Sequence, residues 1–370
     1  MRPRRHRLPT LAALLALVAV LCAATPASAA AAAKPRAGPK VSARAAILVD
    51  AGSGAVLWGR ATRKARPPAS LTKMLTALTV RASLGMKDRV VARRDATRQP
   101  ATRLALKHGQ QLLVWQALEA LMVVSANDVA VMLADGAGGS VARFARAMDA
   151  ESERLGLRDS RWRNPNGLDA SGHRSSAFDL AILARAVLRD PWLARVVRKR
   201  RAAFVAPGGH HHTLYSRSHF LRDYQGAIGI KTGFTDDAGH CLAAAASRHG
   251  RTLVAVVLDS PDNAGDASRL LDWGFGPGRA ARTGLRLPAY VAPASVASLL
   301  APTARVATPR GARAAPAPVR AATRPSPAGW GALSGGDRAA ALAVGAGVVV
   351  LGGACLAVRR RRRRRRIFSR

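Results

Sequence analysis

The motif Ser70-Leu-Thr-Lys73 places a hydroxyl and an amine three residues apart. A helix is predicted to begin here, and residues i and i+3 of a helix share one face, so the Lys73 ammonium can reach the Ser70 hydroxyl. Serine becomes a nucleophile when a neighbouring base takes its proton, and lysine serves as that base once burial or positive charge lowers its pKa. The pair fits a serine nucleophile with a lysine base, although the motif alone fits a helix cap with a solvated lysine equally well.

Two further motifs supply polar groups that acyl transfer needs. Ser125-Ala-Asn127 follows a long apolar segment, and its hydroxyl and amide can relay a proton to a leaving amine and hold a substrate amide. Lys231-Thr-Gly233 follows a short strand-like run. Its lysine and threonine can bind a carboxylate, while the glycine lets a substrate backbone approach the strand. Each motif also has a plain structural interpretation, as a helix cap and as a strand ending in a turn.

The segments around these motifs predict a mixed domain of helices and strands. A β-hairpin is predicted from two apolar runs, 45–50 and 55–58, on either side of turn residues. Helices are predicted from Ser70 and over 112–124, 141–155 and 180–188, the last after a capping box at 176–179. Later strands are predicted over 227–230, 241–246 and 252–258. Because strands lie at both ends with helices between them, the predicted fold class is α+β.

Four longer stretches resemble one enzyme family. They are Pro68-Ala-Ser-Leu-Thr-Lys-Met-Leu-Thr76, Ser125-Ala-Asn-Asp-Val-Ala130, Asn164-Pro-Asn-Gly-Leu-Asp169 and Gly229-Ile-Lys-Thr-Gly-Phe-Thr235. In this order they are similar to the serine-type D-alanyl-D-alanine carboxypeptidases, the low-molecular-mass penicillin-binding proteins of peptidase family S11. The resemblance covers about residues 42–276. It implies a β-lactamase/transpeptidase-like fold, in which an antiparallel sheet packs with helices and an inserted helical subdomain.

The resemblance also implies a role for each motif residue. Ser70 is expected to be the acylated nucleophile, Lys73 its general base, and Ser125 the proton relay to the leaving D-alanine. Residues expected to bind the substrate are Asn127, Lys231, Thr232, Gly233 and Phe234, with the lysine and threonine holding the terminal carboxylate. The backbone N–H groups of Ser70 and Phe234 are expected to form the oxyanion hole. The implied reaction removes D-alanine from peptidoglycan stem pentapeptides without a cofactor or metal, and β-lactam antibiotics are the implied covalent inhibitors.

Related activities remain as alternatives. A D,D-endopeptidase that cuts cross-links carries the same motifs, so the sequence does not separate it from a carboxypeptidase. A β-lactamase often activates water with a glutamate, but Glu151 and Glu153 lack an E-x-x-L-N setting, which disfavours that activity. A penicillin-sensing receptor is also disfavoured, because the short Arg-rich tail leaves no room for an effector domain.

The net charge of +38 suggests a nucleic-acid binder until it is divided along the chain. Residues 41–275 carry 34 basic and 20 acidic side chains, a net charge of +14, so most of the excess lies at the two ends. Nucleic acid is therefore not an expected partner. The adjacent histidines 210–212 have no acidic or cysteine partner nearby in the sequence, so no metal site is expected there.

The two ends of the chain are predicted to be targeting and anchoring segments. The expected order is a signal peptide (1–29), a spacer (30–41), the catalytic domain (42–276), an Ala/Pro/Arg-rich linker (277–337), a transmembrane helix (338–358) and an Arg-rich tail (359–370). Basic residues that follow an apolar span mark its cytoplasmic side. The catalytic domain is therefore expected outside the cytoplasm, anchored in the cytoplasmic membrane, with the tail inside.

Overall fold

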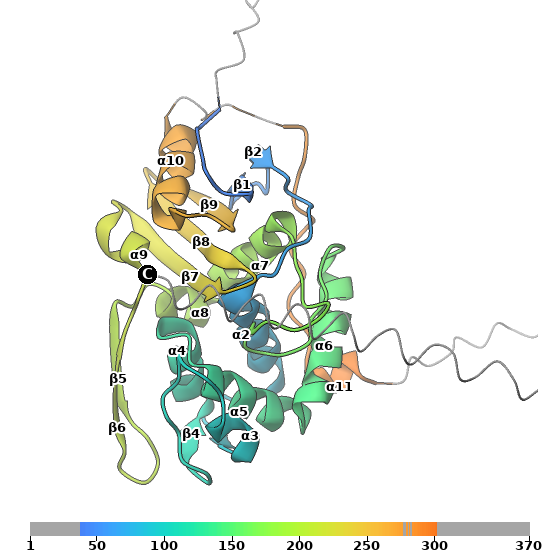
Figure 1. The fold of residues 1–370 in the computed structure, drawn as a ribbon, viewed down its shortest axis with the longest axis vertical. Coiled ribbons are helices and arrows are strands. Elements are labelled where there is room, and N and C mark those ends of the chain that lie inside the picture. Colours follow the sequence, from blue (N-terminus) through green and yellow to red (C-terminus); the bar gives the residue numbers. More distant parts are fainter. Residues whose placement is uncertain (1–37, 277–278, 280, 282, 302–370) are drawn as a thin grey trace, which may run out of the picture. The chain divides into compact units, whose positions relative to one another are not determined.

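An antiparallel sheet of five strands forms the frame of the domain (Figure 1). The computed structural model describes residues 38–276, 279, 281 and 283–301. The strand order is β2 (Val56–Arg60), β1 (Ala45–Asp50), β9 (Arg251–Leu258), β8 (Gly239–Arg248) and β7 (Ala227–Thr235). Strand β1 pairs with β9, so the two ends of the domain meet inside one sheet and the helices lie between them in sequence. The α+β part of the predicted fold class is therefore confirmed.

Both faces of the sheet are covered. Successive side chains of a strand point to opposite faces, and alternate residues of β9 enter two separate hydrophobic cores. Val254 and Val256 belong to the larger core, which the sheet shares with the helical part, whereas Leu253 and Ala255 belong to the smaller one. Helix α10 (Asn263–Phe275) covers the smaller core, and α7 (Ala177–Arg189) packs on β1 and β9. Burial on both sides explains why the later strands are nearly continuous apolar runs.

The helical part surrounds one buried helix, α2 (Lys73–Ser83), which follows directly from the 3₁₀ helix η1 (Ala69–Thr72). Every residue from Lys73 to Val80 is buried, so α2 carries polar side chains into the interior. The helices that pack around it are α4 (Val114–Val123), α5 (Asn127–Gly138), α6 (Val141–Leu155) and α7. Shorter helices are α3 (Arg94–Thr97), α8 (Pro191–Val196), α9 (His219–Asp223) and α11 (Val296–Leu299). Two small sheets pair β3 (Arg89–Val91) with β4 (Gln111–Leu113), and β5 (Arg201–Val205) with β6 (His211–Tyr215).

Several predicted boundaries differ from the structure. The helix predicted over 112–124 begins at Val114, because Gln111–Leu113 pairs with β3 as a strand. The strand predicted over 227–230 continues to Thr235, so it contains the Lys-Thr-Gly motif instead of ending before it. The β5–β6 hairpin and α10 are absent from the prediction. In the apolar run 112–124, hydrophobicity alone does not show where a strand ends and a buried helix begins.

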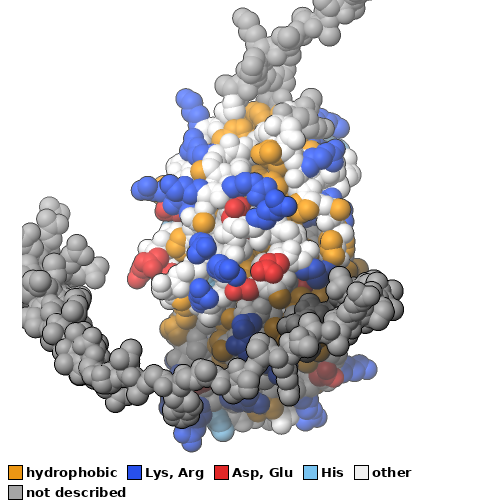
Figure 2. Space-filling model, turned by 90° about the vertical axis from the view of Figure 1, so that its right-hand side faces the viewer, with side chains coloured by type: hydrophobic (Ala, Val, Ile, Leu, Met, Phe, Trp, Pro, Cys, Tyr) orange, Lys and Arg blue, Asp and Glu red, His pale blue; other side chains and the backbone are white. Residues whose placement is uncertain are grey.

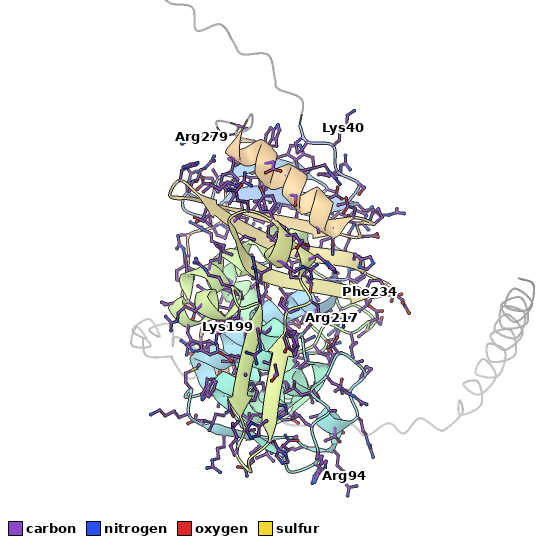
Figure 3. The ribbon with its side chains drawn as sticks, turned by 90° about the vertical axis from the view of Figure 1, so that its left-hand side faces the viewer. Lys40, Arg94, Lys199, Arg217, Phe234 and Arg279 are labelled. Atoms are coloured by element: carbon purple, nitrogen blue, oxygen red, sulfur yellow. The ribbon has the colours of Figure 1, made fainter. Side chains whose placement is uncertain are left out.

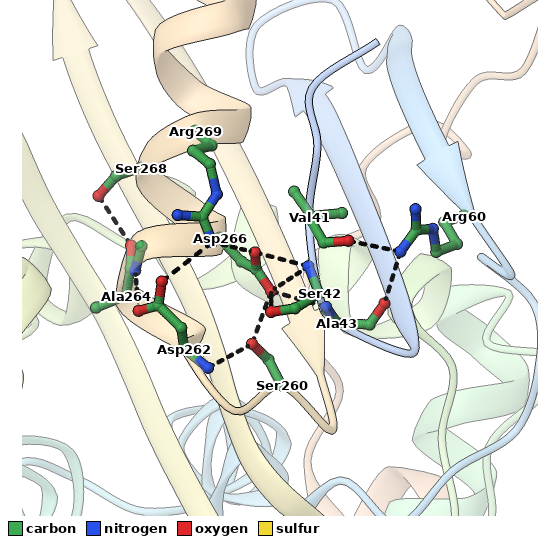
Figure 4. A network of polar contacts seen from close by, with 11 residues as sticks. Val41, Ser42, Ala43, Arg60, Ser260, Asp262, Ala264, Asp266, Ser268 and Arg269 are labelled. Atoms are coloured by element: carbon green, nitrogen blue, oxygen red, sulfur yellow. Dashed lines mark hydrogen bonds and ion pairs between the residues drawn. The ribbon is translucent and has the colours of Figure 1, made fainter.

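A buried carboxylate joins the start of the domain to α10 (Figure 4). Asp266 accepts hydrogen bonds from the backbone N–H groups of Ser42 and Ala43 at 2.9 and 2.7 Å, and from the Ser260 hydroxyl at 2.7 Å. It also forms an ion pair with Arg269. Burial alone raises the pKa of Asp266, but the hydrogen bonds from Arg269, Ser260 and Ser42 outweigh it and lower the pKa to about 2. The ionised carboxylate therefore stabilises the segment that enters β1.

Residues 283–301 differ from the extended linker that the sequence predicts over 277–337. Leu287 and Val296 are buried in the larger core. The backbone N–H of Leu287 donates to the Gly54 carbonyl at 2.9 Å, and that of Val296 donates to the Ser83 hydroxyl at 2.9 Å. This segment lies against the domain because its few apolar residues fill sites beside β2, α2 and α6, which local composition does not reveal.

The predicted fold class needs one correction, which concerns the C-terminal transmembrane helix. Crossing a bilayer takes about 20 apolar residues in a helix. No helix in the described part of the chain is long and apolar enough to do so, and the longest, α6, has 15 residues. The predicted span 338–358 lies outside the described residues, as do the predicted signal peptide 1–29 and Arg-rich tail 359–370. The transmembrane helix is therefore removed from the fold class.

Candidate active site

The predicted nucleophile lies at a sharp entry into the buried helix. Ser70 is the second residue of η1, and Lys73 is the first residue of α2. Ala69, just before Ser70, has a φ of +48°, a left-handed conformation that non-glycine residues adopt at a cost of order 1 kcal/mol or more. Ser70 is half-buried and lines a cavity of about 620 Å³. The predicted residues that share this cavity with it are Ser125, Asn127, Thr232, Gly233 and Phe234.

Lys73 is buried and has three hydrogen-bond partners in the site. Its side chain is fully buried, and its amine donates to Ser70 Oγ at 2.9 Å, to Asn127 Oδ1 at 2.7 Å and to the Asn166 carbonyl at 2.6 Å. Burial lowers the pKa of Lys73 well below its ordinary value, and the positive charge of Lys231 lowers it further. The three contacts use all the N–H bonds of an ammonium. A neutral amine keeps two donors, for Asn127 Oδ1 and the Asn166 carbonyl, and its lone pair then faces Ser70 Oγ and can accept the hydroxyl proton. The structure thus provides the contact that the sequence predicted from helical spacing.

The second motif lies between two helices. Ser125 follows α4 with a φ of +66°, and Asn127 is the first residue of α5. The Asn127 amide accepts from Lys73 and donates to the carbonyls of Pro100 and Ala101 at 3.1 and 3.2 Å. Asn127 therefore holds Lys73 and an adjacent loop in this structure, while its predicted contact with substrate stays a prediction. Ser125 lines the same cavity as Ser70, as a proton relay requires.

The third motif lies inside β7, at the edge of the sheet. Lys231 is almost fully buried, and its amine donates to the Thr232 carbonyl at 2.9 Å. Burial lowers the pKa of Lys231 to about 7. Near neutral pH this amine therefore exists in both forms, and an incoming carboxylate favours the protonated one. A substrate carboxylate beside β7 would thus raise the protonated fraction of Lys231, and the resulting ammonium would bind that carboxylate more tightly.

Gly233 and Phe234 bring the strand to the nucleophile. A Cβ atom at Gly233 would lie 3.0 Å from the backbone nitrogen of Ser70, so a larger residue would push β7 and η1 apart by a few tenths of an ångström. The sequence predicts that Gly233 lets a substrate backbone approach β7. In the structure, the chain segment that approaches β7 at Gly233 is η1 of the protein itself. Phe234 is 56% exposed and projects from the sheet edge, with Arg217 near it at the cavity (Figure 3). The strand register pairs Phe234 with His240, and their rings lie 4.6 Å apart.

Comparison with known proteins identifies the family. A model of peptidase family S11, described as D-alanyl-D-alanine carboxypeptidase, matches residues 29–262. The chain belongs to this family. Two S11 relatives show how much of the chain is shared. D-alanyl-D-alanine carboxypeptidase DacB2 of Mycobacterium tuberculosis is 34% identical over 245 residues, which are 64% of this chain and 84% of that protein. D-alanyl-D-alanine carboxypeptidase DacF of Bacillus subtilis is 28% identical over 241 residues, 63% of this chain and 62% of that protein.

The S11 fold is also found by structural comparison. The crystal structure of D-alanyl-D-alanine carboxypeptidase from Mycobacterium tuberculosis H37Rv matches with a TM-score of 0.62 and 32% sequence identity. The match covers 70% of this chain and 98% of that structure. The chain thus spans nearly all of this solved structure, but less than two thirds of the longer Bacillus relative.

The S11 site contains residues to which the sequence analysis gave no role. The fourth resembling stretch, 164–169, supplies the Asn166 carbonyl that accepts from Lys73, and the Asn166 amide donates to Gln99 at 2.8 Å. Asp169 accepts from the Thr235 hydroxyl at 2.6 Å and so joins this loop to the end of β7. A backbone carbonyl has no residue type of its own, so only the family resemblance of this stretch pointed to it.

Gly167 gives a testable measure of how tightly this loop packs under the nucleophile. We expect Gly167→Ala to destabilise the S11 domain by about 2–4 kcal/mol. A Cβ atom there would lie 1.9 Å from the Ala69 carbonyl oxygen, at a φ of +81°. Urea denaturation followed by circular dichroism measures the change in the free energy of unfolding.

Gly109→Ala is the matched control for this substitution. Gly109 has a φ of +80°, but a Cβ atom at this residue would have nothing within 4 Å, so we expect only the backbone cost of about 1 kcal/mol. Equal losses of stability in the two variants would contradict the close packing of Gly167 against Ala69.

Proposed function

We propose that this protein removes the terminal D-alanine from peptidoglycan stem peptides that end in D-alanyl-D-alanine, through an acyl-enzyme on Ser70. The observation that carries the proposal is the 2.9 Å contact between Ser70 Oγ and the fully buried Lys73 amine, within a chain of family S11. Both carboxypeptidase relatives compared above support the same substrate class by name. Lys231 lines a separate small pocket that shares Thr232 with the Ser70 cavity, and an ammonium at this place suits a substrate that ends in a free carboxylate.

In the acylation step Ser70 attacks the carbonyl carbon of the penultimate D-alanine. Lys73 takes the hydroxyl proton as the Oγ–C bond forms, and the carbonyl electrons move to oxygen. The backbone N–H groups of Ser70 and Phe234 stabilise this oxyanion, a contribution of about 3–4 kcal/mol per donor in other acyl-transfer enzymes. As the C–N bond breaks, Ser125 passes its proton to the amine of the leaving D-alanine and takes one from the protonated Lys73, which returns Lys73 to the neutral amine.

In the deacylation step water takes the place of the leaving amine. Water attacks the Ser70 ester, a base of the site takes the water proton, and the ester oxygen leaves with a proton to restore the hydroxyl. Lys231 and Thr232 are proposed to hold the terminal carboxylate only while the last D-alanine is attached. A β-lactam would acylate Ser70 in the same way, and we propose it as a covalent inhibitor.

We propose that the protein works outside the cytoplasm. The proposal depends on the predicted signal peptide over 1–29 and on the peptidoglycan substrate. Residues 41–275 keep a net charge of +14, and on the face in Figure 2 Lys and Arg side chains are spread widely, with Asp and Glu among them. A spread of this kind suits weak attraction to anionic wall polymers better than a single nucleic-acid groove.

The decisive experiment is product analysis with the full chain. Incubation with a stem pentapeptide should release one D-alanine and leave the tetrapeptide, while a pentapeptide ending in L-alanine should stay intact. Mass spectrometry of digested cross-linked muropeptides separates the alternatives. Loss of cross-links without D-alanine release would identify an endopeptidase, and fast turnover of a chromogenic cephalosporin would identify a β-lactamase. Absence of every product would overturn the proposed reaction.

A further inference from the structure

A chain of hydrogen bonds reaches the peptide group just before the nucleophile. The Thr72 hydroxyl donates to the Ala69 carbonyl at 2.8 Å, and Thr72 Oγ1 lies 2.9 Å from His173 Nε2. His173 comes from the segment before α7, so this contact joins two parts of the chain that are 101 residues apart. Thr72 is fully buried and His173 is almost so.

The direction of each hydrogen bond follows from its donors. The backbone N–H of Arg163 donates to His173 Nδ1 at 3.0 Å, so Nδ1 is an acceptor and the ring proton is on Nε2. The Thr72 hydroxyl has one proton, which it gives to Ala69, so its oxygen accepts from the histidine. Burial lowers the pKa of His173 to about 4, which keeps the ring neutral and preserves this direction at neutral pH.

The ring of His173 is fixed from the side as well. The Trp162 ring packs edge-on against it, with centroids 5.6 Å apart and an interplanar angle of 82°. Trp162 is itself buried, and its backbone N–H donates to Asp149 at 2.9 Å. The imidazole therefore has one orientation available, and its Nε2–H points at Thr72.

The Ala69 carbonyl belongs to the same peptide group as the Ser70 N–H. In a trans peptide these two groups point in opposite directions, so fixing the carbonyl also fixes the N–H. The cis bonds of the described chain lie elsewhere. The Ser70 nitrogen faces β7, since a Cβ atom at Gly233 would lie 3.0 Å from it. The peptide group between Ala69 and Ser70 is therefore held at its carbonyl by Thr72, and its N–H side faces β7.

We propose that His173 is a positioning residue, which acts through Thr72 to aim the backbone N–H of Ser70 at the oxyanion. Neither side chain touches the reacting atoms in this assignment. The positive φ of Ala69 makes such support necessary, because the backbone there does not lie in its preferred conformation. The inference rests on the proposed function, since an oxyanion forms only if Ser70 is acylated.

The test is the acylation rate of the full chain with a fluorescent penicillin and with a stem pentapeptide. Thr72→Val keeps the volume but removes the hydroxyl, and His173→Asn keeps an acceptor near Nδ1 but removes the Nε2 donor. We expect each to lower kcat and the acylation rate by about 10- to 100-fold with KM within about threefold, because an oxyanion donor acts mainly in the transition state. Thr72→Ser, which keeps the hydroxyl, and His173→Gln, whose amide N–H replaces the Nε2 donor, should stay within about threefold of the parent.

A second readout separates positioning from a general loss of structure. A peptide boronic acid forms a tetrahedral adduct whose oxygen occupies the oxyanion site, so its affinity should fall in Thr72→Val by the same factor as kcat/KM. Rates are expressed per folded site, counted by the final extent of penicillin labelling. If Thr72→Val does not fold, the same comparison of boronic acid affinity with kcat/KM is made on His173→Asn.

The outcomes also distinguish this inference from the proposed function. If the parent protein never labels with penicillin and releases no D-alanine, the proposed function fails. If the parent is active but Thr72→Val and His173→Asn acylate within about threefold of it, the positioning role is wrong. A fall in boronic acid affinity smaller than the fall in kcat/KM would also overturn it, since the oxyanion site would then be intact.

Discussion

Replacing Ser70 with alanine should abolish the acyl-enzyme and lower D-alanine release by about 10⁴- to 10⁶-fold, as removal of the nucleophile does in other serine hydrolases. The hydroxyl is the atom that forms the ester, and Lys73 is within 2.9 Å to take its proton. The substitution removes one oxygen from a half-buried residue, so the fold should remain. Intact-protein mass spectrometry after exposure to a β-lactam measures the loss directly, as the absence of the mass increase.

Ser171→Ala is the matched control for this prediction. Ser171 is exposed, on the loop between Asp169 and His173, and lines a separate cavity from Ser70. We expect it to label and release D-alanine like the parent. If Ser70→Ala were still acylated at the parent rate, another nucleophile would carry the reaction and the assignment of all three motifs would need revision.

The central features of the site follow from local patterns in the sequence. Ser70 and Lys73 meet because helical spacing places them on one face, and this relation needs no information from the rest of the chain. The later strands could be predicted because burial of both sheet faces makes them continuously apolar. The order of the motifs along the chain supports the family resemblance, and the resemblance adds a role for each motif residue.

The groups that support the site could not be predicted in the same way. The Asn166 carbonyl and the His173 ring reach Lys73 and Thr72 from 93 and 101 residues away. Their partners depend on how the loop before α7 packs under η1, which is a tertiary property. The sequence predicts a linker over 283–301 because the composition of this segment is linker-like. Its place against the domain, with Leu287 in the core, depends on tertiary contacts.

The electrostatics of the site depend on two buried lysines. Lys73 and Lys231 are both buried, and the charge of Lys231 contributes to the lowered pKa of Lys73. A second ammonium charge in a low-dielectric interior disfavours the protonated form of Lys73, so the charge of Lys231 adds to the effect of burial on the pKa of Lys73. This arrangement suits the proposed division of labour, in which a neutral Lys73 accepts a proton and a protonated Lys231 binds a carboxylate.

Lys73→Met tests that division and should lower the acylation rate by about 10²- to 10⁴-fold, the usual contribution of a general base. Methionine has a similar length without the amine, so Ser70 loses the group that accepts its proton. In the parent the acylation rate should rise with pH as Lys73 loses its proton, because only the neutral amine is a base. In Lys73→Met this rise should disappear. Stopped-flow acylation by a chromogenic β-lactam across the pH range measures both effects.

Lys87→Met controls for loss of a lysine as such, since Lys87 is exposed and should leave the rate and its pH dependence unchanged. The variant Lys73→Met also leaves Asn127 Oδ1 and the Asn166 carbonyl without their donor, so its stability must be measured alongside. A rate within tenfold of the parent that still rises through about pH 7 would show that Lys231, whose pKa burial lowers to about 7, is the base instead. Ser125, which lines the cavity of Ser70, would then carry the proton of Ser70 toward Lys231, and the roles assigned to the two lysines would be exchanged.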